Sequence, residues 1–238
     1  RIAFLAPIGG VLNLWVADVR EPTRARPLTK VTDRDLGPWI VWPHNNRHIV
    51  FFREQGGDEN WQAHRVDLST GDILALTPGP GVKAYIQQIS RHFRDELLIA
   101  HNQRDPRFSD IFRVNVVTGK STLVETNERF GYIFTDPQFR IRYAIRQTDN
   151  GDTEYLQRGV NGEWELFTRI DMADAMSTRA IEFSDDGTEL YWLDSRGRDT
   201  AALVAEDLRT GAKRVLVHDA RADVVGFLTD QQSLRPVA

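Results

Sequence analysis

The stretch at residues 119–123 combines a glycine, a lysine and a serine, a set found in two kinds of reactive site. A hydrolase serine lies on a Gly-x-Ser-x-Gly turn between a strand and a helix, which exposes its hydroxyl beside an oxyanion hole. The sequence here, Gly-Lys-Ser-Thr-Leu, lacks the second glycine, and no helical pattern follows it. A phosphate-binding loop would need a glycine where Val114 stands. We therefore interpret the stretch as an ordinary turn and expect no catalytic residue in this chain.

Two histidines, His44 and His48, have the four-residue spacing that places two metal ligands on one face of a helix. Pro43 and the following pair of asparagines predict a turn between strands instead, so the spacing loses its geometric meaning. The other histidines occur singly, with no recurring carboxylate cluster beside them. We interpret all six as structural or surface residues.

Three acidic turns, at residues 58–60, 149–152 and 185–187, suggest calcium as a ligand. None has the alternating acidic spacing and closing glutamate of a calcium-binding loop. Asp and Asn are common in turns because their side chains hydrogen-bond the nearby backbone. The chain also has no cysteine, which excludes cysteine-ligated zinc and iron–sulfur sites. We expect neither a metal nor a cofactor.

The composition is that of an ordinary globular protein: 41% hydrophobic and 27% charged residues in a chain of 238. Thirty basic and 34 acidic residues give a net charge of -4, and the two signs are interleaved. Without a basic block, we expect neither nucleic acid nor a membrane surface as a partner. The chain starts at Arg1 with no visible targeting segment, so we expect a piece of a longer protein, cytoplasmic or periplasmic.

A pattern of strands and turns repeats along the chain with a period of about 47 residues. Successive polar anchors before a turn are spaced by 49, 48, 44 and 48 residues: Asp18, Asp67, Asn115, Gly159 and Asp207. The apolar runs keep the same step, with intervals of 47, 48, 44 and 49: Phe4, Phe51, Ile99, Tyr143 and Trp192. Each repeat holds four short runs rich in β-branched and aromatic residues, which are typical of strands.

Four strands per repeat of 40–50 residues is the sequence signature of a β-propeller. The sequence predicts an all-β fold of four-stranded antiparallel blades, with a turn or two of helix at most, at residues 171–176. Because an open arc of blades would expose edge strands, we expect a single-domain fragment of a seven- or eight-bladed propeller. We expect about four full blades and two partial ones, at residues 1–31 (partial), 36–78, 81–126, 129–170, 177–218 and 222–238 (partial).

The loops between the middle two strands of successive blades are rich in charge. Equivalent loops emerge on one face of a propeller, so these charges are expected to gather there. A solvated rim would have the same composition. The alternative is a substrate-gating or docking face, where acidic groups bind the amino terminus of a peptide and arginines its carboxylate. The candidates for it are Asp58, Glu59, Arg104, Asp105, Arg198 and Asp199.

The six tryptophans and twelve phenylalanines allow a stacking surface for sugars or nucleic acid. Many of them lie inside the strand runs, and we interpret these as packing between blades. They include Trp15, Phe51, Phe52, Phe112 and Trp192.

Several segments together resemble a known family. Ser-Asp-Asp-Gly-Thr at residues 184–188 resembles the "SPDG" turn of TolB-like and peptidase propellers, and residues 42–51 have the same layout. The segments at 56–61, 66–71 and 195–203 follow in an order similar to the N-terminal propeller of the prolyl oligopeptidase family. Its bacterial dipeptidyl aminopeptidase and acylaminoacyl peptidase branch is the most similar. The resemblance covers essentially the whole chain.

In that family the propeller precedes an α/β-hydrolase domain with a Ser-Asp-His triad, caps the active site and admits only small or unfolded peptides. The hydrolase domain is absent from this sequence. The resemblance therefore implies a non-catalytic, substrate-gating part of a serine peptidase. Its partners would be the hydrolase domain of the same parent chain and a peptide substrate. A TolB-like propeller that binds other proteins is the alternative. A propeller glycosidase or lactonase ranks last, since no convergent carboxylate set repeats.

Overall fold

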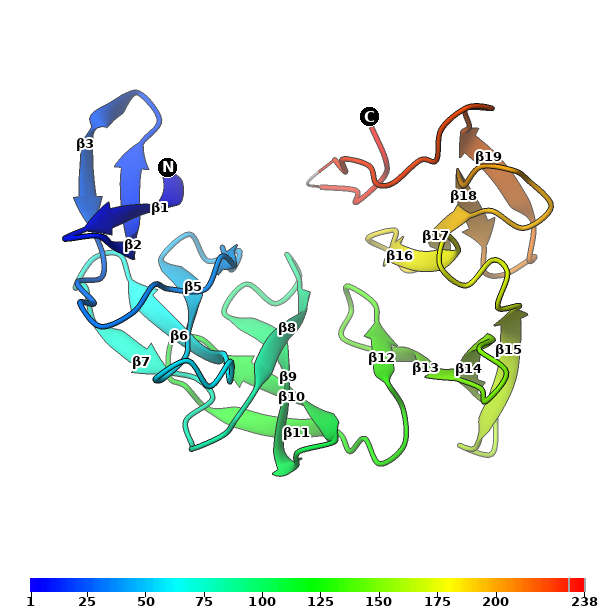
Figure 1. The fold of residues 1–238 in the computed structure, drawn as a ribbon, viewed down its shortest axis with the longest axis horizontal. Coiled ribbons are helices and arrows are strands. Elements are labelled where there is room, and N and C mark those ends of the chain that lie inside the picture. The colour runs from blue at the N-terminus through cyan, green and yellow to red at the C-terminus, as the bar shows by residue number, and fades with distance from the viewer. Residues whose placement is uncertain (231, 238) are drawn as a thin grey trace. The chain divides into compact units, whose positions relative to one another are not determined.

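The computed structural model describes residues 1–230 and 232–237, and every regular element in these ranges is a β-strand. The strands form five antiparallel sheets, in each of which strands adjacent in sequence are also adjacent in space (Figure 1). We call these sheets blades 1 to 5 in chain order. The chain divides into two compact units, Arg1–Asn127 and Glu128–Ala238, and each is described by itself.

Unit 1 contains blades 1 to 3. Blade 1 has three strands: β1 (Ile2–Ile8), β2 (Val11–Asp18) and β3 (Glu21–Pro27). Blade 2 has four strands: β4 (Ile40–Val41), β5 (His48–Arg53), β6 (Gln62–Asp67) and β7 (Ile73–Ala75). Blade 3 also has four strands: β8 (Ala84–Ile89), β9 (Glu96–Asp105), β10 (Phe108–Asn115) and β11 (Ser121–Glu125).

Unit 2 contains blades 4 and 5, with four strands each. Blade 4 comprises β12 (Tyr132–Thr135), β13 (Ile141–Gln147), β14 (Thr153–Arg158) and β15 (Trp164–Ile170). Blade 5 comprises β16 (Arg179–Phe183), β17 (Glu189–Asp194), β18 (Ala202–Asp207) and β19 (Lys213–Val217). The all-β fold of four-stranded antiparallel blades predicted from the repeat is therefore confirmed.

Two connecting segments of unit 2 lack regular secondary structure. Residues 172–177, where one or two helical turns were expected at most, form consecutive turns, closed by a 2.8 Å hydrogen bond from the Thr178 N–H to the Asp174 carbonyl. After β19, the described residues form no strand, and an isolated antiparallel bridge joins Thr229 to Pro236. Gln231 and Ala238, which belong to the expected partial blade at 222–238, lie outside the described residues.

The polar anchors of the repeat are residues that build the outer turn of a blade. In blade 2, the Oδ1 atom of Asp67 accepts the backbone N–H groups of Ser69 and Thr70 at 2.8 and 3.4 Å. The Gly71 N–H donates to the Asp67 carbonyl at 2.8 Å, and Gly71 has a φ of 80°, a left-handed conformation that favours glycine. Asn115 and Asp207 accept the equivalent N–H groups in blades 3 and 5. In blades 2, 3 and 5 the period therefore arises from the same local turn chemistry, whereas the anchor of blade 4, Gly159, has no side chain to accept these bonds.

Apolar side chains pack between adjacent blades within each unit. In unit 1 the core between blades 2 and 3 includes the fully buried Val50 and Ile99, together with Phe52. In unit 2 Phe183 and Trp192 are fully buried in the core of blades 4 and 5. The interpretation of Phe52 and Trp192 as packing residues is therefore confirmed.

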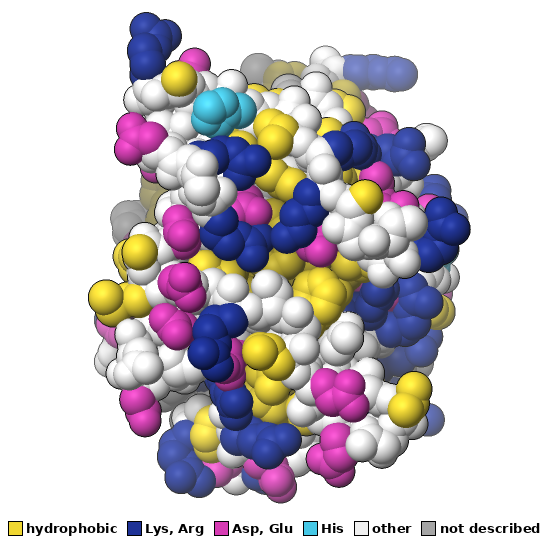
Figure 2. Space-filling model, turned by 90° about the vertical axis from the view of Figure 1, so that its right-hand side faces the viewer, with side chains coloured by type: hydrophobic (Ala, Val, Ile, Leu, Met, Phe, Trp, Pro, Cys, Tyr) yellow, Lys and Arg dark blue, Asp and Glu magenta, His cyan; other side chains and the backbone are white. Residues whose placement is uncertain are grey.

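The surface shows charges of both signs. On the face in Figure 2, Lys and Arg side chains alternate with Asp and Glu side chains, and hydrophobic side chains lie between them. This distribution agrees with the interleaved charges of the sequence. In the part of the chain that the structure describes, no helix is long and apolar enough to cross a membrane.

Candidate functional site

Arg104 lies at the end of β9 and pairs with Asp110 in β10. Its Nε and Nη2 atoms donate to the two carboxylate oxygens at 2.7 and 2.8 Å, and Nη2 also donates to the Asn127 carbonyl at 2.6 Å. Burial alone would raise the pKa of Asp110, but the hydrogen bonds from Arg104 and from the Asn127 N–H outweigh it, and the pKa lies below its usual value. Any ligand carboxylate would compete with Asp110 for Arg104.

Asp105 accepts hydrogen bonds from Arg107 across the same β9–β10 loop. The Arg107 Nη2 and Nε atoms donate to the Asp105 carboxylate at 2.8 and 3.1 Å, and the Arg107 backbone N–H donates at 3.0 Å. These hydrogen bonds, first that of the guanidinium, lower the pKa of Asp105 to about 2. The Arg107 side chain is exposed and the Asp105 side chain is partly buried, and the pair shapes the loop.

Asp58 and Glu59 lie in the loop between β5 and β6. The Asp58 carboxylate accepts the Asn60 backbone N–H at 3.0 Å and its side-chain amide at 3.1 Å, and these bonds lower the pKa of Asp58. Glu59 has a φ of 56°, and its backbone N–H donates to the buried Glu54 carboxylate at 2.8 Å. Arg34 pairs with the other oxygen of Glu54. Asp58 thus closes the turn, and the Glu59 side chain is exposed.

Arg198 and Asp199 lie in the loop between β17 and β18 in unit 2, and both side chains are exposed. The Arg198 backbone N–H closes the turn by donating to the Ser195 carbonyl at 2.8 Å. At the base of this loop, Arg196 donates to the buried Asp194 carboxylate at 2.7 and 2.9 Å. Carboxylate–guanidinium pairs thus brace loops of both units.

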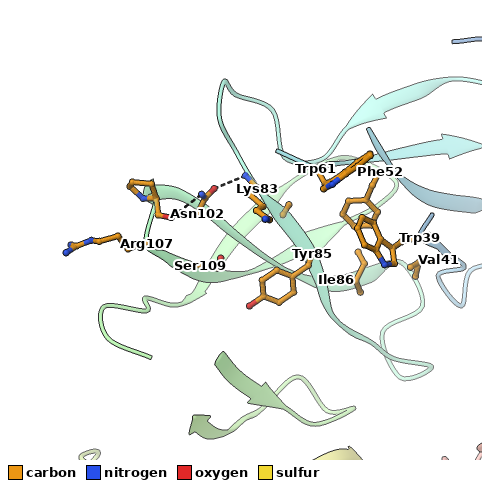
Figure 3. A pocket seen from close by; sticks show the side chains of 12 residues that line it. Trp39, Val41, Phe52, Trp61, Lys83, Tyr85, Ile86, Asn102, Arg107 and Ser109 are labelled. Atoms are coloured by element: carbon orange, nitrogen blue, oxygen red, sulfur yellow. Dashed lines mark hydrogen bonds between the residues drawn. The ribbon is translucent and has the colours of Figure 1, made fainter. Parts of the chain in front are cut away.

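The ends of the two charged loops of unit 1 border one pocket between blades 2 and 3. It has a volume of about 600 Å³ and is hollowed beside the end of the β5–β6 loop, at Trp61, and the β9–β10 loop, at Arg107. Figure 3 shows Trp39, Phe52 and Trp61 grouped on one side, Asn102 and Arg107 on the other, and Lys83 between them. The pocket thus lies next to the predicted site residues of unit 1.

Three aromatic rings form one wall of the pocket. The Trp39 ring meets Trp61 edge to face, with centroids 5.7 Å apart, and Phe52 in the same way at 6.0 Å. Phe52 is buried, whereas Trp39 is 52% exposed. Gly37 lies against the wall, and its N–H donates to the Phe52 carbonyl at 2.9 Å. The aromatic wall is therefore fixed by its contacts with Phe52 and Gly37, and its Trp39 ring is accessible to solvent.

The opposite side of the pocket is polar and positively charged. The Asn102 Oδ1 atom accepts the Lys83 backbone N–H at 2.7 Å, and the Asn102 N–H donates to the Lys83 carbonyl at 3.2 Å, which fixes the start of β8 against the end of β9. The Arg107 guanidinium, held by Asp105, extends away from the aromatic side chains (Figure 3). Among the described lining residues none is acidic. An apolar wall with a cationic edge suits an apolar group that carries a negative charge.

Comparison with known proteins identifies relatives over almost the whole chain. No family model matches it. Dipeptidyl aminopeptidase BIII of Pseudoxanthomonas mexicana is 37% identical over 231 residues, which cover 96% of this chain and 33% of that protein. Dipeptidyl peptidase family member 6 of Caenorhabditis elegans is 26% identical over 243 residues, covering 95% of this chain and 32% of that protein. The chain spans about a third of the length of these curated relatives.

Solved structures give the same fold. A prolyl endopeptidase superposes with a TM-score of 0.56 at 11% identity, over 90% of this chain and 32% of that one. TolB of Acinetobacter baumannii superposes with a TM-score of 0.52 at 16% identity, over 87% of this chain and 49% of that one. The predicted resemblance to the prolyl oligopeptidase propeller is confirmed. Likeness at these low identities shows the propeller fold alone.

Sequence reasoning did not single out the aromatic wall of this propeller as a site. It assigned the aromatic residues inside the strand runs to packing between blades, which holds for Phe52, and it did not single out the half-exposed Trp39. The position of these tryptophans in the sequence could have distinguished them from the packing residues. Trp39 follows Pro38, and Trp61 ends a loop, so both lie outside the strand runs. Lys83 had no signal, because nothing local distinguishes it from other surface lysines.

His48, one of the two histidines considered for metal binding, lies in β5 as a buried residue with side-chain neighbours. The Asn45 side-chain amide is 2.9 Å from its Nδ1 atom and Asp67 is 3.6 Å from its Nε2 atom. Burial is the main cause that lowers the pKa of His48. Over residues 1–230 and 232–237, no three side chains of His, Cys, Asp or Glu are grouped so as to hold a metal ion.

Proposed function

We propose that this chain is the non-catalytic, substrate-gating propeller of a serine peptidase that cleaves small peptides. The observation that carries the proposal is the 37% identity to dipeptidyl aminopeptidase BIII over 96% of this chain, with only 33% of that protein aligned. The reaction would then be carried out by a hydrolase domain in the parent chain, which is also the expected partner of this propeller. The propeller would restrict, by its size and its loops, which peptides reach that domain.

The internal contacts of the chain support a gating role rather than a catalytic one. Arg104 and Asp105, two of the charged candidates, are engaged by Asp110 and Arg107. Ser121, the serine of the Gly-Lys-Ser stretch, begins the exposed strand β11 and pairs in register with Val114. Such a serine lies on a sheet edge, without the strand–turn–helix geometry that exposes a nucleophile. The charged loops are therefore proposed to act by shape and by surface charge.

The test is to read the complete gene and to assay its protein beside the 238-residue chain. We expect the gene to encode a Gly-x-Ser-x-Gly turn followed by Asp and His. We expect its protein to hydrolyse a dipeptidyl p-nitroanilide but not a folded protein that contains the same dipeptide. The 238-residue chain alone is expected to give no turnover.

Two results would contradict the proposal. One is turnover by the 238-residue chain that is lost when one of its own residues is replaced. The other is a gene without a hydrolase domain, whose protein forms a stable complex with another protein and hydrolyses nothing. The second result would favour the TolB-like binding module.

A further inference from the structure

We propose that the pocket between blades 2 and 3 binds the carboxyl-terminal residue of a short peptide. Its aromatic or large aliphatic side chain would lie against Trp39 and Trp61, and its carboxylate would pair with Lys83. The inference deepens the proposed function, and it rests on that function for the source of the peptide. The pocket itself is built entirely from unit 1.

The size and the lining of the pocket suit an apolar group. Its volume of about 600 Å³ lies within the range of roughly 300–1,000 Å³ typical of small-molecule sites. Trp39 leaves 52% of its surface exposed beside this hollow. An apolar group that covered the ring would remove that surface from water, which favours binding. Tyr85 and Ile86 extend the apolar lining along β8 (Figure 3).

The aromatic wall is preorganised, so little conformational freedom remains to be lost on binding. Trp61 packs against Gly37 so closely that a β-carbon there would lie 3.0 Å from its ring. Its edge-to-face contact with Trp39, at 5.7 Å, orients the exposed ring. Side chains that are already ordered in the free protein reduce the entropic penalty of association.

The charge at the pocket favours a carboxylate over an ammonium group. Of the two basic residues that line it, Arg107 is held by Asp105, whereas Lys83 is exposed and forms no ion pair with any residue that the structure describes. No acidic side chain among the described lining residues offsets this charge. A ligand with an ammonium group would therefore meet unpaired positive charge, and a carboxylate would meet a free partner.

A carboxyl-terminal residue combines both required groups on one α-carbon. Figure 3 shows Lys83 between the aromatic wall and Asn102. A ligand that contacts both the aromatic wall and Lys83 therefore needs its charged group close to its apolar side chain. The Ser109 hydroxyl, also in the lining, offers a further hydrogen bond to the peptide amide. An internal peptide segment would bring the side chain without the charge.

Binding by the protein of the complete gene tests the proposal, with N-acetyl-phenylalanine and N-acetyl-phenylalanine amide as the probes and calorimetry as the readout. We expect the acid to bind about tenfold more tightly than the amide, the usual effect of one charge-assisted hydrogen bond. Lys83→Met should remove this difference and leave amide binding unchanged. Trp39→Ala should weaken both probes about tenfold. Trp39 is half exposed, so its truncation spares the core.

Matched controls replace an exposed lysine and a tryptophan that do not line the pocket, as Lys120→Met and Trp164→Ala. Both controls should bind the acid like the unmodified protein. Equal binding of acid and amide, insensitivity to Trp39→Ala, or no binding of either probe would each overturn the proposal. Both probes are N-acetylated and therefore lack the free amino terminus of a dipeptidyl substrate, so binding of the probes and hydrolysis of dipeptidyl substrates are measured separately. Failure to bind in a protein that hydrolyses dipeptidyl substrates would therefore refute the pocket alone, and binding without hydrolysis would refute the proposed function alone.

Discussion

Trp61 packs against the bare α-carbon of Gly37. A β-carbon at residue 37 would lie 3.0 Å from two ring atoms of Trp61 and 3.2 Å from the Phe52 β-carbon. The backbone at this glycine is not in the left-handed region, so the requirement is for space rather than for conformational freedom. This contact joins the segment before β4 to the start of β6 and holds the aromatic wall of the pocket.

Gly37→Ala is therefore expected to destabilise the protein by about 1–3 kcal/mol, the usual range for overpacking a well-packed site. Urea unfolding measures the effect. Gly226→Ala is the matched control, because a β-carbon there meets no atom within 4 Å and its φ is also outside the left-handed region. Equal stability of the two variants would show that the contact with Trp61 is looser than described.

Arg104→Met is expected to lower the free energy of unfolding by about 2 kcal/mol, because it leaves the buried Asp110 carboxylate without its guanidinium partner. The additional replacement Asp110→Asn should restore part of this loss, since it removes the unpaired charge. Arg107→Met is the control, as the Arg107 guanidinium is exposed and its pair with Asp105 should contribute little. A loss as large in the control would contradict the assignment of Arg104 as a bracing residue.

Stability is expected to fall as the pH is lowered from about 6.5, the ordinary pKa of histidine. Burial lowers the pKa of His48, His64 and His101, so below this pH the unfolded chain takes up protons that the folded chain does not. The loss continues until the pH reaches the folded-state pKa values. Urea midpoints between pH 7.5 and 5 measure it, and a midpoint that stays constant over this range would be inconsistent with neutral buried histidines.

His101→Phe should reduce that pH dependence without lowering stability at pH 7.5. The His101 ring stacks on Phe112 with centroids 4.1 Å apart, a contact that phenylalanine can keep. Its Nδ1 atom is buried and has no hydrogen-bond partner among the residues the structure describes, so the replacement removes an unsatisfied polar atom. A variant that is markedly less stable at pH 7.5 would mean that the ring nitrogen has a partner in solution.

Asp186→Ala is expected to destabilise the turn before β17 by about 1 kcal/mol. The Asp186 Oδ1 atom accepts the hydroxyls of Ser184 and Thr188 at 2.7 and 2.8 Å, and these bonds and the Thr188 N–H hold its pKa at about 2. Its stabilisation is thus present above the ordinary pKa of about 3.9 and lost as the pH falls toward 2. Titration by NMR checks the pKa. Asp199→Ala, on an exposed loop, is the control.

The blades themselves could be predicted because their causes are local. A turn such as that at Asp67 and Gly71 needs only residues within five positions of one another, so it repeats wherever the sequence repeats. The runs of β-branched and aromatic residues that form β5 and β17 likewise carry their strand preference within six residues. The same local reasoning predicted a turn at the start of residues 119–123, but Ser121 to Leu123 lie in β11 rather than in the turn.

The sequence by itself determined the blade repeat, the turn residues and the interleaved charge of this protein, since each depends on neighbours along the chain. Only the tertiary structure brought Trp39, Trp61 and Lys83 to one pocket, and only it showed that Arg104 is engaged by Asp110 and Asn127. The pocket joins residues of blades 2 and 3, and the Arg104–Asp110 pair joins two strands of blade 3. Both depend on how strands and blades pack, and a repeat pattern carries no information about which side chains meet across that packing.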